Sequence, residues 1–554
     1  MVLTILKRNL HRIVLLSTIA AATFNALKPI ENWLRWSDFQ RVPLPTIPWE
    51  DSVYYLSQVR AVIQGGNLFG NPIFTEDRLN GGDFSFGNSF LFVFWGLLAK
   101  VLGLQLLQLY IVMIVINSVI FALSCYLLSK LFIGRTNAAI ISLIAIILIG
   151  SLGRPSPTQQ MLGWTIFTLY FYLLCISRSK LSIDSVLNKE LFIYATLFLI
   201  LVVSNPLYAG YLLLFTIIYE LSSQVMCGKV RKIRLTKYSV IGIALCLAYG
   251  VYTEMETDSA ETLMALRFGV HQTRIPGAIT LSLIAGLGLV VSFVLMKRTL
   301  KETEAHFSIA AILFSINLSL LLAINSQVFT GKAYEMESHF GLLSLSLNLL
   351  VLFCIFVSIL KIWNLEKMYH VTLFIVLFTM TLSHLAGNNP ALDLKNTRDL
   401  EYTRFLQLVH GEKRVILVRD DVGYRLSELL IYTTDAKLYW HPYIAGSKAS
   451  DVEVIERFAC SRKEELSFEA FKLLEPEIYF HRFANTELKL SRAGKFIGFL
   501  KSDLEMFQRE KARILKRDYR RYITNYENCK RGNFKYKIDL VIQADSSFLV
   551  SDRA

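Results

Sequence analysis

Several features that mark common protein classes are missing from this chain of 554 residues. The sequence has no internal repeat and no low-complexity tract, so neither a repeat array nor a biased linker is expected. No Gly-rich phosphate loop lies near Asp420-Asp421, which follows a predicted strand and is therefore interpreted as a strand-end turn. The alanines at 20–22 imitate a signal-peptide cleavage site, but the following segment 25–30 is better interpreted as the end of an uncleaved signal anchor.

Charged residues are also few. They make up 18% of the chain, whereas hydrophobic residues make up 53% and the mean hydropathy is +0.44. Long apolar runs of this kind predict lipid-embedded helices. The formal net charge is +14, but the basic residues are spread over many loops. That distribution suits the positive-inside rule of membrane proteins and argues against a nucleic-acid partner, which would need a clustered basic surface.

The segment 86–103 decides the predicted topology. It is long enough to span a membrane, yet it contains Gly87, Asn88, Gly96 and Lys100. If it spanned, the basic loops that follow it, including KVRKIRLTK at 229–237, would all fall outside. An interfacial helix returns them to the cytoplasm, and we therefore expect an interfacial helix at 86–103.

Eleven membrane spans are then expected, and those shorter than about 20 residues require tilt or local thinning of the bilayer. Lys7, Arg8 and Arg12 place the N-terminus in the cytoplasm, so an odd number of spans places the C-terminus outside. The predicted spans are 12–28, 105–129, 137–152, 160–176, 191–204, 207–225, 239–253, 278–296, 306–325, 342–363 and 371–385.

The predicted fold is therefore a polytopic α-helical membrane domain at 1–386, with a first outer loop at about 29–104, followed by an exoplasmic α/β domain at 387–554. Strand signals in the second domain lie at 414–419, 437–441, 477–481 and 537–543, an amphipathic run lies at 425–432, and a long charged helix is expected at 500–522. That helix carries many basic residues, but interspersed acids make a solvated face the favoured interpretation.

Five of the seven cysteines lie in or beside the predicted spans, where packing is the expected role. Cys460 and Cys529 lie in the predicted outer domain. The sequence leaves open whether an oxidising compartment joins them or both remain thiols.

The first outer loop carries an unusual set of acids beside the membrane. Asp51 lies three residues before Tyr54-Tyr55, Glu50 is adjacent, and Glu76-Asp77 follow later in the loop. Transfer of a sugar to a hydroxyl needs a group that removes the hydroxyl proton, and a carboxylate at a membrane boundary can serve as that base. The alternative is an ordinary extracytoplasmic loop with solvated carboxylates.

The other predicted outer loops carry cations on the same side of the membrane. A phosphate leaving group needs cationic or N–H partners as negative charge develops, and the planar fork of Arg suits its oxygens. A helix-end or headgroup contact is the alternative for any single cation. The candidates are Arg154 in GRPSPTQQ, Arg267, His271 and Arg274 in RFGVHQTRIPG, and Lys332 with His339 in NSQVFTGKAYEMESHFG.

The order of signal anchor, acidic loop with D-x-x-Y-Y, interfacial helix, Arg-Pro loop and C-terminal α/β domain resembles the GT-C class of polytopic glycosyltransferases. The segments DSVYYLSQVRAVIQGGNLFGNP, GRPSPTQQ and NSQVFTGKAYEMESHF resemble the corresponding loops of bacterial members related to polyprenyl-phosphate-sugar mannosyltransferases. The resemblance implies a plasma-membrane enzyme of the bacterial inner membrane that takes a sugar from a polyprenyl phosphate, inverts its anomeric carbon and acts on a glycan, lipid or protein acceptor on the outer face.

The resemblance also implies roles for individual residues. Asp51 matches the presumed base, Glu50 could exchange roles with it, and Glu76 is the substitute if the loop register differs. The absence of a D-x-D pair fits a lipid-phosphate donor and leaves open whether a divalent metal is needed. A non-catalytic lipid or glycan transporter and an assembly subunit are the rival hypotheses. The remaining expected substrate-binding residues are Tyr55, Arg60, Arg154, Gln159, Arg267, His271, Arg274, Lys332 and His339.

Overall fold

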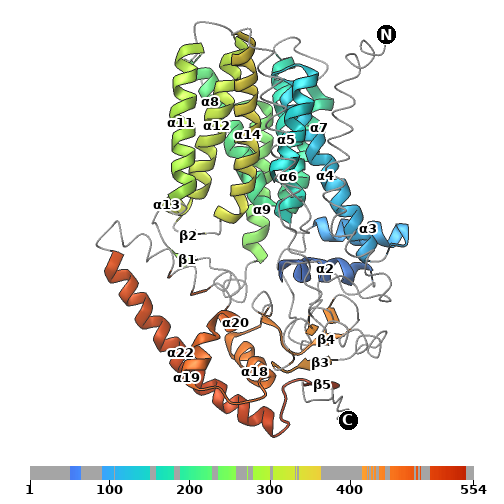
Figure 1. Ribbon diagram of the computed structural model, residues 1–554, viewed down its shortest axis with the longest axis vertical. Coiled ribbons are helices and arrows are strands. Elements are labelled where there is room, and N and C mark those ends of the chain that lie inside the picture. The colour runs from blue at the N-terminus through green and yellow to red at the C-terminus, as the bar shows by residue number, and fades with distance from the viewer. Residues whose placement is uncertain are drawn as a thin grey trace.

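A computed structural model shows a bundle of long apolar helices and, beyond one end of the bundle, a C-terminal α/β unit at 415–543 (Figure 1). The structure describes residues 50–63, 90–104, 106–149, 157–179, 187–226, 235–256, 271–272, 279–299, 304–330, 332–333, 336–362, 415–420, 422, 426–427, 430–431, 436–442, 444, 449–479, 482–483, 487 and 500–543. The predicted first and last spans, and the predicted domain boundary at 386–387, lie outside these residues.

The bundle is built from helices that run from one of its ends to the other (Figure 1). Their apolar side chains share one continuous core, which is why they pack side by side. α4 packs on α5 and α6, α6 and α7 lie together, α8 contacts α12, and α12 lies between α11 and α14. Their bounds are α4 Leu106–Lys130, α5 Arg135–Ile149, α6 Pro157–Ser179, α7 Leu187–Ser204, α8 Pro206–Met226, α9 Lys237–Glu256, α11 Ile279–Thr299, α12 Glu304–Ile324 and α14 Met336–Ile362.

The division between α7 and α8 falls at Asn205-Pro206, as predicted. Asn205 Oδ1 accepts a hydrogen bond from the Tyr208 backbone N–H at 3.2 Å, which caps the start of α8. Pro206 occupies the first helical position, where its missing N–H costs nothing. Two local signals therefore end one helix and begin the next.

Three of the described helices are long and apolar enough to cross a membrane, namely those with Gln108–Lys130, Thr158–Ser177 and Phe340–Val357. Shorter apolar helices contain Phe90–Leu102, Arg135–Ala145, Lys237–Val251, Thr280–Leu295 and Ile309–Ile324. The structure thus contains a mainly helical apolar domain, while the full set of eleven spans and the sidedness remain predictions.

Two further helices, α2 Glu50–Ile63 and α3 Phe90–Leu102, lie across the end of the bundle that faces the α/β unit (Figure 1). At the same end, β1 His271–Gln272 pairs with β2 Lys332–Ala333, next to the short helix α13 Gln327–Thr330. The segments predicted to form outer loops therefore contribute elements to one end of the bundle.

The α/β unit contains a parallel sheet of three strands in the order β4-β3-β5, with bounds Val415–Val418 for β3, Lys437–Leu438 for β4 and Leu540–Ile542 for β5. Each strand lies inside a segment that was predicted as a strand. The predicted charged helix is also present, and as α22 Leu500–Lys530 it is longer than expected. Helices α18 Asp451–Ser461 and α19 Phe468–Leu473 pack against α22.

The predicted strand at 477–481 is wrong, because this segment begins inside a helix, α20 Glu475–Tyr479. Pro476 lies in its first turn, where proline is tolerated, and Ile478 and Tyr479 are buried. A short apolar run has no clear period, and the helical start next to it decided the conformation.

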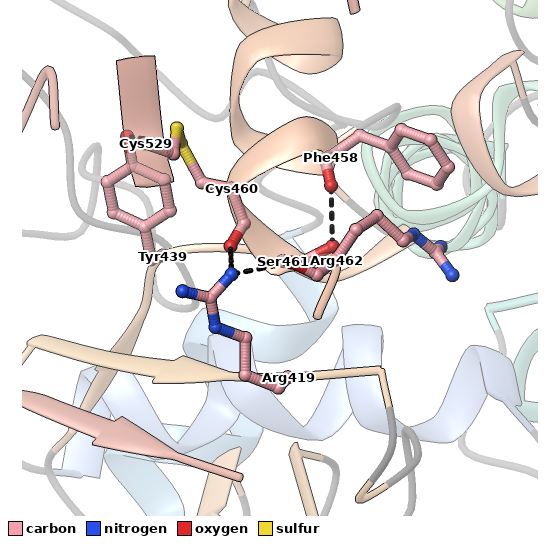
Figure 2. The surroundings of a disulfide bond; sticks show 7 residues. All are labelled: Arg419, Tyr439, Phe458, Cys460, Ser461, Arg462 and Cys529. Atoms are coloured by element: carbon pink, nitrogen blue, oxygen red, sulfur yellow. Dashed lines mark hydrogen bonds between the residues drawn. A yellow bond between two sulfur atoms is a disulfide. The ribbon is translucent and has the colours of Figure 1, made fainter. Parts of the chain in front are cut away.

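A disulfide joins Cys460 of α18 to Cys529 of α22, which settles the alternative that the sequence left open (Figure 2). Next to it, the Arg419 guanidinium donates hydrogen bonds to the carbonyl oxygens of Cys460 at 2.5 Å and Arg462 at 2.6 Å. These bonds satisfy carbonyls at the C-terminus of α18, where a cation is also favoured by the helix dipole. The α/β unit is therefore held together by a covalent link and by buried polar contacts around its own core.

Candidate functional site

Helix α2 carries the predicted base and lies between the two cores of the molecule. Glu50 and Asp51 are in its first turn, where the positive end of the helix dipole favours a negative charge. Farther along, Leu56 and Val59 are buried. Tyr55, which is half-buried, packs against the core of the bundle and also against the core of the α/β unit. The position of the acidic turn therefore depends on both parts of the chain.

Contacts with α3 fix one side of α2. The Tyr55 ring stacks on the Phe92 ring with centroids 5.3 Å apart. Two turns farther on, the helices approach so closely that a Cβ atom at Gly96 would lie 2.4 Å from the Val62 Cβ. Only glycine allows this approach without a shift of one helix. Tyr55, predicted to bind substrate, is thus also a packing residue of the α2–α3 contact.

A second contact joins α3 to the segment that contains GRPSPTQQ. The Trp95 indole N–H donates a 2.7 Å hydrogen bond to Gln160 Oε1, and both side chains are buried. Gln159, a predicted substrate-binding residue, is half-buried beside it in the first turn of α6. Helix α3 therefore contacts α2 on one side and, through Trp95, the start of α6.

The loops that carry His271 and Lys332 meet in a two-stranded antiparallel sheet. His271 pairs with Ala333, and Gln272 pairs with Lys332. Residues 62 and 60 positions apart in the chain thereby become backbone neighbours. His339 follows shortly after, in the first turn of α14. Three of the predicted cationic positions therefore come from adjacent elements at the end of the bundle where α2 lies (Figure 1).

Two polar residues in the second half of α2 are buried. Arg60, predicted to contact substrate, is buried among the contacts of α2. Gln58 is buried as well, and among the described residues neither its Nε2 nor its Oε1 has a hydrogen-bond partner. A buried amide left in this state costs about 1–3 kcal/mol per group. Gln58 is therefore the polar group of α2 most in need of a partner.

Several predicted site residues lie outside the described residues, so the distances between the acids and the cations remain predictions. Glu76, Arg154, Arg267 and Arg274 lie in such segments. The backbone, but not the side chain, is described for Glu50, Asp51, His271, Lys332 and His339. Within the residues that the structure describes, no group of three or more His, Cys, Asp or Glu side chains is arranged to hold a metal ion.

Sequence reasoning did not select Trp95, Gln160 or Gln58 as functional residues. A tryptophan in an apolar run is expected to be a packing residue, and its bond to Gln160 crosses 65 positions of sequence. In the sequence alone, Gly96 argues only against a spanning helix. Its position in the bulky run FLFVFWGLLAKVL is the signal that a close helix approach was needed there.

Comparison with known proteins gives little further information. No protein-family model matches the chain, and no curated protein matches it. Among solved structures, the chain is similar to the archaeal oligosaccharyltransferase AglB from Archaeoglobus fulgidus, which was determined in complex with an inhibitory peptide and a dolichol-phosphate. The TM-score is 0.40 and the identity 12%, and the match covers 78% of this chain and 65% of that one. A likeness of this degree carries no conclusion about activity, which rests on the residues of this chain.

Proposed function

We propose that the protein is a polytopic membrane glycosyltransferase that moves a sugar from a polyprenyl-phosphate donor to a glycan, lipid or protein acceptor at the outer face of the plasma membrane. The observation that carries the proposal is the acidic first turn of α2, which lies at the end of the bundle where β1 and β2 bring His271 and Lys332 together. A base and an anion-binding group are the two parts that such a transfer needs.

The proposed reaction assigns a separate task to each group. The Asp51 carboxylate removes the proton from the acceptor hydroxyl, whose oxygen then attacks the anomeric carbon from the face opposite the phosphate. The bond from that carbon to the phosphate oxygen breaks, and its electron pair leaves with the phosphate. Arg154, Arg267 and Arg274, with Lys332 and His339, stabilise the charge that develops there, and the anomeric carbon is inverted. Glu50 and Glu76 are the alternatives to Asp51.

The disulfide supports placing the site on the outer side of a membrane. Disulfides persist in oxidising compartments and are rare in the cytosol. Cys460 and Cys529 belong to the α/β unit, which lies at the same end of the bundle as α2 (Figure 1). A bond there fits an exoplasmic α/β unit facing an exoplasmic site.

The test is to incubate the purified protein in lipid nanodiscs with a panel of polyprenyl-phosphate sugars and to follow release of the polyprenyl phosphate. Turnover of at least one donor, lost in Asp51→Asn, is the expected result. No turnover of any donor, with or without glycan, lipid and peptide acceptors, would contradict the proposal.

A further inference from the structure

Helix α22 carries a straight row of four cationic side chains on its outer side. Arg509, Arg513, Lys516 and Arg520 are all exposed, and the Arg513 side chain is 77% exposed. Their spacing of i, i+4, i+7 and i+11 places them along one side of the helix over about 16 Å, and they are called here the α22 row. The opposite side of α22 contributes to the core of the α/β unit and packs on α18 and α19.

The acidic residues that interrupt the sequence of α22 do not interrupt the row. Asp518 lies on the opposite side of the helix, where it is fully buried and accepts a hydrogen bond from the Tyr479 hydroxyl. Its charge offsets those of Arg517 and Arg521, which lie outside the row. Glu505 precedes the row by one turn. The acids that favour a solvated face in the sequence therefore weaken the row less than their number indicates.

Within the row, the cations lie close together with few anions to match them. Arg513 forms a 2.7 Å ion pair with Glu510, whereas Arg509, Lys516 and Arg520 form none with any residue that the structure describes. Like charges three and four residues apart on a helix repel each other and destabilise it. A negatively charged ligand along the row removes this repulsion. The α22 row is therefore a surface that an anion stabilises.

The shape and position of the row indicate the kind of anion. α22 runs obliquely away from the bundle, and its C-terminal end is among the parts of the molecule farthest from the bundle (Figure 1). A bilayer around the bundle would therefore not follow the row. A protein partner would need aromatic or apolar anchors at the centre of its contact, but the large apolar side chains from 509 to 520 are buried or half-buried. A straight row of flexible cations instead fits a linear polyanion.

We propose that the α22 row binds an acidic glycan, with anionic groups of the polymer beside its cations. The guanidinium groups of Arg509, Arg513 and Arg520 donate paired hydrogen bonds to carboxylate or phosphate oxygens, and the Lys516 ammonium acts as a single charge. Such binding is screened by salt and holds the glycan beside the α/β unit. The inference concerns binding alone and stands whether or not the protein transfers a sugar.

The test measures how tightly the whole protein, in nanodiscs of zwitterionic lipid, binds a fluorescent oligogalacturonate. This probe is a linear glycan with a carboxylate on each sugar, and its methyl-esterified form is the uncharged control. Fluorescence anisotropy at low ionic strength gives the Kd. The row variant is Lys516→Gln/Arg520→Gln. The matched variant, Arg531→Gln/Lys537→Gln, removes the same two kinds of charge from exposed positions outside the row.

We expect the row variant to bind the acidic oligomer about tenfold more weakly than the parent, and the matched variant to bind it within about twofold of the parent. The esterified oligomer should not bind. Failure of the parent to bind the acidic oligomer would overturn the proposal, because the row would then be an ordinary solvated face. Equal losses in the two variants would overturn it too, since net charge rather than the row would then attract the glycan.

A second series separates the glycan from lipid headgroups. The measurement is repeated in nanodiscs that contain phosphatidylglycerol, an anionic lipid. The parent should still bind the oligomer about tenfold more tightly than the row variant, because the row does not touch the bilayer. Loss of this difference in the anionic nanodiscs would show that headgroups occupy the row and would overturn the proposal. None of these measurements needs a sugar donor, so they remain informative if the proposed function is wrong.

Discussion

Asp51 and Gln58 both belong to helix α2 but matter to the protein in different ways. Asp51 lies in the first turn of α2, where the helix dipole favours an ionised carboxylate. Gln58 is buried seven residues later and lacks hydrogen-bond partners among the described residues. The proposed transfer reaction depends on Asp51, while the packing of α2 has to accommodate the buried amide of Gln58.

Asp51→Asn should abolish sugar transfer while leaving folding and donor binding nearly intact, because the amide keeps the shape and cannot accept the proton. Removal of a general base typically lowers the rate by about 10²- to 10⁴-fold. Single-turnover kinetics with an identified donor measure this loss. The matched controls are Glu50→Gln, Glu76→Gln and Asp77→Asn, which should lose less. Full activity in Asp51→Asn would exclude it as the base, and equal losses in all four variants would indicate a role of the loop in folding or metal binding.

Gly96→Ala should destabilise the protein, because the new Cβ would meet Val62 at 2.4 Å and force α2 and α3 apart. Overpacking of this kind costs about 1–3 kcal/mol. Thermal unfolding in detergent measures the change. Gly210→Ala is the matched control, since it places a methyl group within helix α8 where nothing lies within 4 Å. A loss of stability as large in the control would mean that the cost does not come from the α2–α3 contact.

At the scale of elements, the disulfide Cys460–Cys529 joins α18 to α22, and β4 contributes to the same hydrophobic core as these two helices. The sheet supplies few strands and each is short. Links between the helices that flank the sheet therefore contribute much of the stability of the α/β unit. Two changes in the stability of this unit can be measured.

Reduction of the Cys460–Cys529 bond should lower the stability of the α/β unit by about 2–4 kcal/mol, because the bond closes a loop between residues 69 positions apart. The measurement is urea unfolding of the intact protein with and without dithiothreitol. The double variant Cys460→Ala/Cys529→Ala should start at the lower stability and show no response to the reductant. An equal response in parent and variant would show that the reductant acts elsewhere.

His441, which follows β4, should make the stability of the α/β unit depend on pH. Burial lowers the pKa of His441 from 6.5 to about 3, so the folded state keeps this side chain neutral. Below pH 6.5 the His441 imidazole binds a proton in the unfolded chain but not in the folded chain. Stability should therefore fall by about 1.4 kcal/mol per pH unit between pH 6.5 and 3.

Urea unfolding of the parent and of His441→Gln at pH 7.5, 6 and 5 tests this dependence. The difference between the two proteins isolates the contribution of His441 from that of other titrating groups. The variant should lose less stability on acidification than the parent. Parallel pH profiles would contradict the assignment.

At the scale of the whole molecule, the two ends of the bundle differ. α2, α3, β1 and β2 lie at the end that faces the α/β unit, whereas α5 begins at the opposite end with Arg135 (Figure 1). A site built from the first end can be reached only from one side of the membrane. The proposed function therefore requires that this end of the bundle face the outer side of the membrane.

Lys100→Cys and Lys472→Cys should react in intact cells with a thiol reagent that does not cross the membrane, whereas Arg135→Cys should react only after the cells are opened. All three side chains are exposed, so accessibility within the protein does not decide the outcome. The parent protein provides the background of its own cysteines. Labelling at position 135 but not at position 100 would reverse the topology and remove most of the support for the active site.

Local signals in the sequence were sufficient for several elements. β3, β4 and β5 lie within apolar segments predicted as strands, and the break at Asn205-Pro206 follows from a cap and a proline. These signals act over a few residues, where backbone preferences and side-chain period decide the conformation. The same reasoning failed at 477–481, because a short apolar run has no clear period and the helical start at Glu475-Pro476 prevailed.

Only the tertiary structure decided which distant residues meet. The pairing of β1 with β2, the bond from Trp95 to Gln160, the disulfide Cys460–Cys529 and the stacking of Tyr55 on Phe92 all join segments far apart in the chain. Residue types alone do not specify such partners, since many arginines, aromatics and cysteines could serve equally well. The choice comes from how helices and strands pack when the two cores form, and for this protein that packing places Tyr55 of α2 against both of them.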